Sequence, residues 1–143
     1  MLIEQASTVT DELLDALTRL IPQLKISSPR LTRDGLAGLL ASDATSLLTA
    51  RDDGGVIVGM LTLVHYRTPT GIRARIEDVV VDESARGKGI AVELIQRALS
   101  LAREKGADGV ALTSNSRREA ANRLYQKVGF KVWETNVYFY KFE

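Results

Sequence analysis

The sequence predicts one α+β domain over residues 1–143, an α/β sandwich in which a mixed, mostly antiparallel sheet of about seven strands is flanked by four helices. Three strand-like segments separated by glycine turns within residues 45–81 predict an antiparallel meander. A long amphipathic helix at residues 89–105 and a short apolar segment at residues 110–113 follow. Such a right-handed crossover places the fourth and fifth strands parallel. The predicted order of elements is βααβββαβαββ.

The first third of the chain predicts one strand and two helices. Residues 2–6 have the pattern of a strand. Thr10 can cap a helix with an acidic first turn, and Pro22 is expected to end that helix together with Ser27-Ser28-Pro29. The apolar residues between them follow helical spacing, at Leu13, Leu14, Leu17, Leu20 and Ile21. Thr32 can cap a second, shorter helix.

Glycine turns delimit the strands of the meander. Asp52-Asp53-Gly54-Gly55 is a predicted hairpin turn, because glycine takes a positive φ without steric cost. Thr68-Pro69-Thr70-Gly71 is a second turn. The strands around these turns are expected at residues 45–50, 56–66 and 72–81.

The last part of the chain predicts a helix and two strands after the short fifth strand. Gly106 suits a left-handed cap at the end of the long helix. Ser116 and Glu119 have capping-box spacing, which predicts a helix over about residues 117–128. The final strands are expected at residues 131–134 and 137–142.

Composition excludes several kinds of site. The chain has no cysteine and one histidine, which excludes disulfides and a cysteine nucleophile, and no metal site is expected. A net charge of +1 gives no general attraction for nucleic acid. No apolar run is long enough to span a bilayer, and the N-terminus lacks the pattern of a signal peptide. We therefore expect a cytoplasmic protein without membrane association.

The stretch from Ile76 to Ala91 is the most informative part of the sequence. A β-branched strand runs into a loop with two glycines and two cations, and an amphipathic helix follows at once. Backbone N–H groups, a helix N-terminus and positive side chains around one small space suit a diphosphate. The loop is not a Walker loop, because Gly89 follows Lys88, and it is not a dinucleotide fingerprint, because Val92 replaces the third glycine. Alone, it could also be a solvated turn.

Two motifs together resemble the GNAT superfamily of N-acetyltransferases. The first is Arg86-x-x-Gly89-x-Ala91 after a valine-rich strand. The second combines Asn115 with Asn122 and a following Leu-Tyr-x-x-x-Gly-Phe pattern, at Leu124, Tyr125, Gly129 and Phe130. The separation of the motifs and the order of elements fit that family over nearly the whole chain.

The resemblance implies acetyl-coenzyme A as the acyl donor. Backbone N–H groups of the loop would hold its pyrophosphate, at Arg86, Gly87, Lys88, Gly89, Ile90 and Ala91. In relatives the fourth and fifth strands splay, and the pantetheine arm pairs with the fourth, here through Val79, Val80 and Val81. Asn115 and Asn122 would add polar contacts to the cofactor. Asn115 could equally be a loop residue before the cap at Ser116.

The resemblance also suggests two catalytic residues. Tyr125 would protonate the leaving thiolate, although its place in the helix also suits a core aromatic. Glu77 would take the proton of the attacking ammonium, with Asp78 as its rival; Glu77 could instead bind the amine or pair with Arg73 or Arg75. In a flat strand Glu77, Val79 and Val81 would share one face, unless a bulge typical of the family alters that count. The N–H of Val80 or Val81 would stabilise the oxyanion.

The expected reaction is transfer of acetyl to a primary amine by direct attack in a ternary complex, without an acetyl-enzyme. The acceptor would be a small molecule, or a protein lysine or N-terminus. Its groove could be bordered by residues 27–30, 65–67 and 138–140, and an acidic acceptor could be bound by Arg30, Arg67, Arg73 or Arg75. A non-catalytic acyl-coenzyme A sensor and a toxin-like enzyme acting on charged transfer RNA are the alternatives. A homodimer is possible by analogy.

Overall fold

The computed structural model describes residues 1–24 and 27–143, which form two compact units. The first unit is Met1–Leu112 and the second is Thr113–Glu143. That residues 1–143 make one domain stays a prediction.

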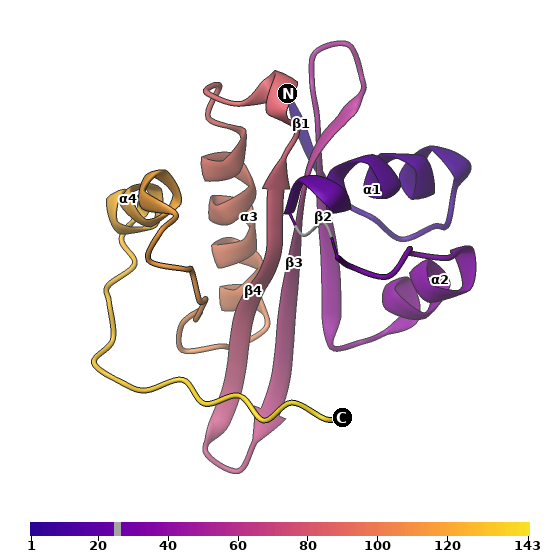
Figure 1. Ribbon diagram of the computed structural model, residues 1–143. Coiled ribbons are helices and arrows are strands. Elements are labelled where there is room, and N and C mark those ends of the chain that lie inside the picture. Colours follow the sequence, from indigo (N-terminus) through magenta and orange to yellow (C-terminus); the bar gives the residue numbers. More distant parts are fainter. Residues whose placement is uncertain (25–26) are drawn as a thin grey trace. The chain divides into compact units, whose positions relative to one another are not determined.

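The first unit is built on an antiparallel sheet with the strand order β1-β2-β3-β4 (Figure 1). Its strands are β1 (Leu2–Gln5), β2 (Thr45–Arg51), β3 (Ile57–Thr68) and β4 (Gly71–Val81). The first hairpin turn forms as its sequence predicts: Asp52 N donates to Val56 O at 2.9 Å, and Gly55 has φ 84°. The antiparallel meander is therefore confirmed.

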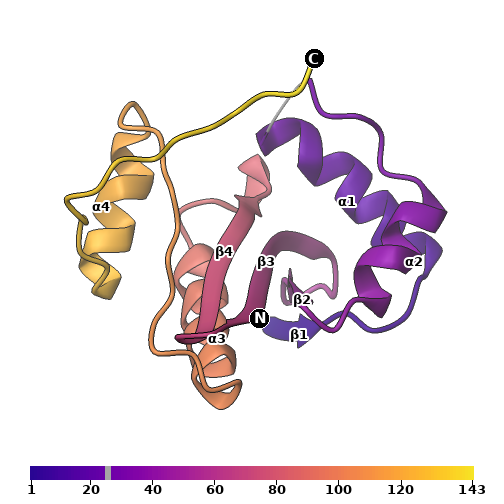
Figure 2. The ribbon, with the colours of Figure 1, turned by 90° about the horizontal axis from the view of Figure 1, so that it is seen from below.

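Helices cover both faces of this sheet. The helices α1 (Asp11–Leu24) and α2 (Arg33–Ala41) lie on one face, and α3 (Ile90–Glu104) lies on the other (Figures 1 and 2). Both predicted threonine caps form, because Thr10 Oγ1 accepts from Leu13 N at 3.1 Å and Thr32 Oγ1 accepts from Gly35 N at 3.0 Å. Pro22, however, does not end α1. It removes one intrahelical donor only two residues before the helix ends at Leu24, so the helix tolerates it.

The core of this unit has two layers. On the α1–α2 side, a cluster of buried residues brings together α1, α2 and the sheet, with Leu13, Ala16, Leu17, Leu20, Leu36, Leu47, Ile57, Met60 and Val80. On the α3 side, Gly59 allows close approach, since a Cβ there would lie 3.2 Å from Leu94 Cδ1 and 3.3 Å from Ile90 Cγ2. α3 ends as its sequence predicts, with Gly106 at φ 89° and Ala107 N donating to Ala102 O at 3.1 Å.

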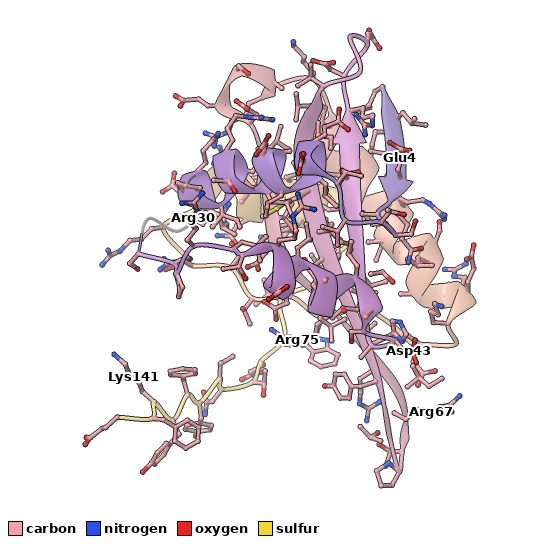
Figure 3. The ribbon with its side chains drawn as sticks, turned by 90° about the vertical axis from the view of Figure 1, so that its right-hand side faces the viewer. Glu4, Arg30, Asp43, Arg67, Arg75 and Lys141 are labelled. Carbon is pink, nitrogen blue, oxygen red and sulfur yellow. The ribbon has the colours of Figure 1, made fainter. Side chains whose placement is uncertain are left out.

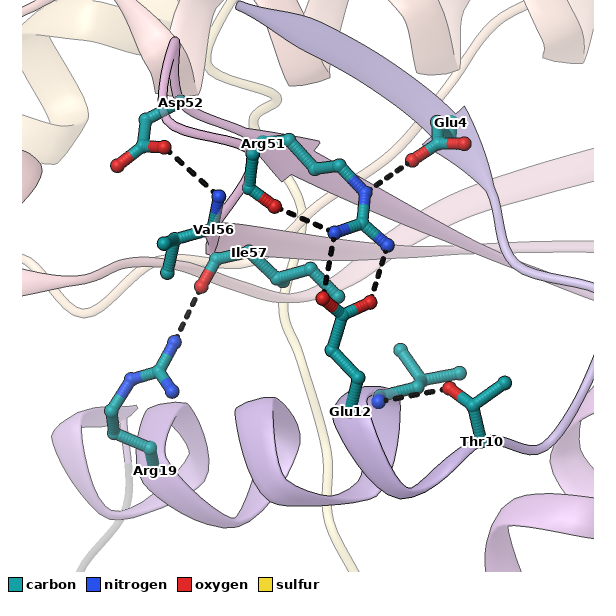
Figure 4. A network of polar contacts seen from close by, with 10 residues as sticks. Glu4, Thr10, Glu12, Arg19, Arg51, Asp52, Val56 and Ile57 are labelled. Atoms are coloured by element: carbon teal, nitrogen blue, oxygen red, sulfur yellow. Dashed lines mark hydrogen bonds and ion pairs between the residues drawn. The ribbon is translucent and has the colours of Figure 1, made fainter.

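An ion-pair network around Arg51 ties the N-terminal elements together (Figure 4). Its guanidinium donates to Glu12 through both terminal nitrogens, at 2.6 and 3.0 Å, and to Glu4 at 2.7 Å. It also donates to the carbonyl of Gly55 at 2.7 Å. The hydrogen bonds from Arg51 lower the pKa of the Glu12 carboxyl. Because Arg51 connects β1, β2 and α1, it fixes the end of the sheet at which β4 also finishes.

The second unit contains one helix, α4 (Glu119–Val128), followed by an extended, exposed chain. The predicted capping box does not form: the N-cap residue is Arg118, and it has no side-chain cap bond. Asn115 makes the preceding turn instead, because its Oδ1 accepts from Arg117 N at 2.9 Å. Gly129, with φ 124°, ends the helix.

The expectation of about seven strands is wrong for the described residues, which contain four strands and four α-helices. The predicted fifth strand reduces to one parallel bridge between Arg75 and Ala111, with Ile76 N donating to Ala111 O at 3.0 Å. The predicted strands at residues 131–134 and 137–142 are extended without a ladder. Alternating apolar residues favour extended backbone, but a strand also needs a partner for its backbone groups. None of the described helices is long and apolar enough to cross a membrane.

Candidate functional site

A bulge interrupts β4 close to its end. Thr62 pairs with Glu77 and Met60 pairs with Val80, so two residues of β4 stand opposite Leu61 alone. Asp78, one of these two, has φ 52°, and it is the only described residue other than glycine with a positive φ. The bulge reverses the expected alternation: Glu77 lies on the same face as Val80, and not on that of Val79 and Val81.

The bulge also decides which backbone groups face away from β3. Asp82 N donates to Val58 O at 2.7 Å, which makes Asp82 and, two residues earlier, Val80 point toward β3. The N–H groups of Val79 and Val81 consequently point to the outer edge of the sheet. Arg86 Nε donates to Val81 O at 3.1 Å, so the loop is tied to this edge.

The loop after β4 presents a series of backbone donors. Gly87 and Gly89 have φ 79° and 80°, which is the left-handed conformation, and a Cβ at either position would meet nothing within 4 Å. The first helical bond of α3 runs from Glu93 N to Gly89 O at 3.1 Å. The N–H groups of Ile90, Ala91 and Val92 therefore have no acceptor within the helix. Residues 86–89 are all exposed, so the backbone of this loop, which leads directly into the positive end of α3, is open to an anion.

Contacts from α1 hold the start of this loop. Arg19 Nε donates to Asp82 Oδ2 at 3.2 Å and Arg19 also bonds the carbonyl of Ile57, while Glu83 N donates to Gln23 Oε1 at 2.9 Å. Asp82 caps a short 3₁₀ helix, η1 (Glu83–Ala85), that leads into the glycines. The hydrogen bonds from Ser84, together with Arg19, lower the pKa of the Asp82 carboxyl. These contacts could not be predicted from local sequence patterns, because about 60 residues separate the partners.

Glu77 lies beside Arg75, with Arg75 Nε donating to Glu77 Oε1 at 3.0 Å. Both side chains are partly exposed, at 34% for Arg75 and 45% for Glu77. The pairing that the sequence left open is therefore formed with Arg75, and Arg73 instead donates to Thr70 Oγ1 at 2.8 Å. Because the Glu77 side chain keeps this exposure with the ion pair formed, solvent still reaches it, and an amine could reach it too.

The second motif forms a small structure of its own. Asn122 Nδ2 donates to the carbonyl of Asn115 at 3.0 Å, and Arg118 N donates to the same carbonyl at 3.0 Å. Asn115 and Asn122 thus fix the turn that leads into α4. Each asparagine keeps one polar side-chain atom, Asn115 Nδ2 and Asn122 Oδ1, that these bonds do not use.

Tyr125 is the buried residue of α4, with 8% of its surface exposed. Its ring packs edge-on against Phe130, with the ring centroids 6.0 Å apart. Burial raises the pKa of the Tyr125 phenol, so the hydroxyl keeps its proton at neutral pH. A neutral phenol is the form that a proton donor needs.

The candidate residues divide between the two units. β4 and the glycine loop belong to residues 1–112, and Asn115, Asn122 and Tyr125 belong to residues 113–143. Tyr138 to Tyr140 are exposed in the second unit, and Arg30 and Arg67 are exposed in the first. Among the described residues, no group of three or more His, Cys, Asp or Glu side chains is placed to hold a metal ion.

Comparisons with known proteins agree with this geometry. A family model described as Acetyltransferase (GNAT) family matches residues 10–130. Glucosamine 6-phosphate N-acetyltransferase of Trypanosoma brucei brucei is 40% identical over 83 residues, 56% of this chain and 54% of that protein. Aminoalkylphosphonate N-acetyltransferase of Salmonella typhimurium (strain LT2) is 33% identical over 105 residues, 69% of this chain and 65% of that protein.

The fold is also similar to solved structures over nearly the whole chain. AAC(6')-Iy, in complex with the bisubstrate analog CoA-S-monomethyl-acetylneamine, superposes with a TM-score of 0.80. It is 23% identical, and the match covers 97% of this chain and 96% of that one. The chain spans about half the length of the curated relatives that it matches first.

Proposed function

Because the chain belongs to the GNAT acetyltransferase family, we propose that it transfers acetyl from acetyl-coenzyme A to a primary amine of a small molecule, by direct attack in a ternary complex. The observation that carries this proposal is the exposed loop, in which two left-handed glycines lead directly into the N-terminus of α3 and its unpaired backbone donors.

The donor would bind along β4 and the loop. Its pyrophosphate would accept hydrogen bonds from the backbone of residues 86–91, with Arg86 and Lys88 adding positive charge. Gly87 and Gly89 fit this use, since the space where a Cβ would stand is open for the phosphates. The amides of pantetheine would pair with the outward groups of Val79 and Val81. The solved neighbour AAC(6')-Iy, whose bound analog includes coenzyme A, supports this choice of donor.

The chemistry needs a base, an acid and an oxyanion donor. Glu77, directly or through a water, would take the proton from the ammonium of the acceptor, and Asp78 is the alternative base. The N–H of Val81, which points to the outer edge, would stabilise the oxyanion better than that of Val80, which faces β3. Tyr125 would protonate the departing thiolate. Asn115 and Asn122 would contact coenzyme A through the side-chain atoms that remain free.

The relatives support a small-molecule acceptor. Their names specify glucosamine 6-phosphate and aminoalkylphosphonates, which are small amines and not proteins. A cytoplasmic location and a homodimer remain part of the proposal.

An amine panel with acetyl-coenzyme A and detection of the free thiol tests the proposal. We expect thiol release that depends on one class of amine, with a stoichiometric N-acetyl product seen by mass spectrometry. Reactions without amine are the control for simple hydrolysis of the thioester. Tight binding of acetyl-coenzyme A without thiol release for any amine would contradict catalysis and support the sensor.

A further inference from the structure

The β3–β4 hairpin carries a line of charges on one face. Glu77, Arg75 and Arg73 occupy alternate positions of β4, and their partners on β3 are Thr62, Val64 and Tyr66. Alternate residues of a strand share a face, so the three charged side chains form one row, which we call the charged row.

The charged row continues the face that α1 and α2 cover. Met60 and Val80, next along this face, lie in the core against α1. Beyond Glu77 the face opens: Arg73 is exposed and Tyr66, its cross-strand partner, is 45% exposed. The row therefore runs from the bulge, where acetyl would be transferred, toward the tip of the hairpin.

Arg67 does not belong to the charged row. It pairs with Ile72, and both stand at positions that alternate with those of the row. Ile72 lies on the side of α3, because its Cδ1 is 3.2 Å from where a Cβ of Gly106 would stand. Figure 3 shows Arg67 and Arg75 leaving the hairpin in different directions. The structure thus separates Arg67 from Arg73 and Arg75, the two arginines of the charged row.

Some guanidinium nitrogens of the charged row are not used in hydrogen bonds to the described protein atoms. Arg75 uses Nε for Glu77, and within the described part of the chain its two terminal nitrogens have no protein acceptor. Arg73 uses one terminal nitrogen for Thr70. The row itself carries two guanidiniums and one carboxylate, so its own net charge is positive, and a guanidinium can bind a phosphoryl group through two parallel bonds.

We propose that the acceptor carries a phosphate or phosphonate group as well as its amine, with the amine at Glu77 and the anion at the charged row. This rests on the proposed function, because it assigns the substrate class of the same site. Alternate residues of a strand are about 6.8 Å apart, so Arg75 suits a phosphoryl group close to the amine. Arg73, at about twice that distance from Glu77, suits a longer acceptor.

Two pairs of acceptors test the proposal: 2-aminoethyl phosphate against ethanolamine, and glucosamine 6-phosphate against glucosamine. In at least one of the two pairs, we expect kcat/KM to be at least about 10-fold higher for the phosphorylated amine than for the neutral one. Arg75→Gln should lower this ratio about 10- to 100-fold for the short pair, and Arg73→Gln should lower it for the long pair. The matched control Arg67→Gln, an arginine of the same hairpin on the other face, should leave both ratios unchanged.

The ratio separates recognition from a structural effect. Arg75→Gln also removes the partner of Glu77, but that loss acts on both members of a pair and cancels in the ratio. Arg75→Lys should restore part of the ratio, because it keeps the charge and loses the fork of donors. If a variant does not fold, the kcat/KM ratios of the unaltered enzyme for the two pairs still show whether it prefers phosphorylated acceptors.

Equal acetylation of phosphorylated and neutral amines would overturn this inference and leave the proposed function standing. The inference would also be overturned, with the proposed function left standing, if Arg73→Gln and Arg75→Gln gave the same kcat/KM ratios as Arg67→Gln. Failure to acetylate any amine, although acetyl-coenzyme A binds, would overturn the proposed function and with it the acceptor class.

Discussion

The glycine loop and α4 carry the two halves of the proposed chemistry in different ways. The loop would act through its backbone: the donors would be N–H groups set by the left-handed Gly87 and Gly89, and no side chain would be needed to orient them. α4 acts through a side chain, since a single hydroxyl on Tyr125 would supply the proton. Binding by the loop would therefore depend on its backbone conformation, and proton donation from α4 would depend on the hydroxyl oxygen of Tyr125.

The two regions also differ in what supports them. The loop begins at residues bonded to α1, at Asp82 and Glu83, and lies against a sheet with a two-layer core. α4 is positioned by its own turn, through the bond between Asn122 and Asn115, and by the ring contact between Tyr125 and Phe130. Substitutions in the loop should therefore act on ligand binding, and substitutions around α4 should separate into effects on chemistry and effects on local stability.

Tyr125→Phe should have the largest effect on the reaction. Removal of the proton donor should lower kcat by about 10²- to 10⁴-fold, while the dissociation constant for coenzyme A changes little. The ring and its packing on Phe130 are kept, so the thermal unfolding midpoint should stay close to that of the unaltered protein. Steady-state kinetics and calorimetric titration measure the two quantities.

Phe130→Leu is the control for Tyr125→Phe, because it weakens the same ring packing and leaves the hydroxyl. It should lower the unfolding midpoint and change kcat by less than about 10-fold, which is the range below general-acid effects. Unchanged turnover of Tyr125→Phe would remove Tyr125 from the mechanism, and α4 would then be purely structural.

Gly89→Val should have the next largest effect, and it acts on binding. A branched side chain strains the left-handed backbone and fills the space that the pyrophosphate would occupy, so coenzyme A affinity should fall by about 100-fold or more, which is about 3 kcal/mol. Titration calorimetry with coenzyme A measures this loss.

Gly55→Val provides a matched control for the loop. Gly55 has φ 84°, close to the 80° of Gly89, and a Cβ at either position meets nothing within 4 Å. Both variants should cost at least about 1–2 kcal/mol of stability from the left-handed backbone. Only Gly89→Val should have a lower affinity for coenzyme A. Equal affinities in the two variants would show that the loop is an ordinary turn.

Local signals in the sequence predicted much of the fold. The caps at Thr10 and Thr32, the turn at Gly55 and the helix end at Gly106 each depend on residues within a few positions, and each is confirmed. The glycine loop was predictable for the same reason, since only its own residues determine the left-handed conformation.

Features that depend on distant partners were not predictable. The family resemblance allowed for a bulge, but its position at Asp78, which moves Glu77 to the face of Val80, follows only from the register between β3 and β4. The bond from Arg19 to Asp82 joins residues 63 positions apart. The error in strand number has the same origin, because a run of alternating apolar residues does not specify which backbone, if any, will pair with it.

Asn122→Ala should have the smallest effect, and it decides whether the second motif serves structure or cofactor. The loss of one side-chain hydrogen bond to the Asn115 carbonyl should cost about 1 kcal/mol, expressed as faster hydrogen exchange at the start of α4. Asn122→Asp keeps Oδ1 but sets a second carboxylate oxygen against the Asn115 carbonyl, so its structural loss should be at least as large. If the remaining amide oxygen contacts coenzyme A, Asn122→Ala should weaken affinity by about a further 5- to 10-fold relative to Asn122→Asp. Equal affinities would assign Asn122 to the turn alone and leave the backbone of the loop as the principal ligand of the cofactor.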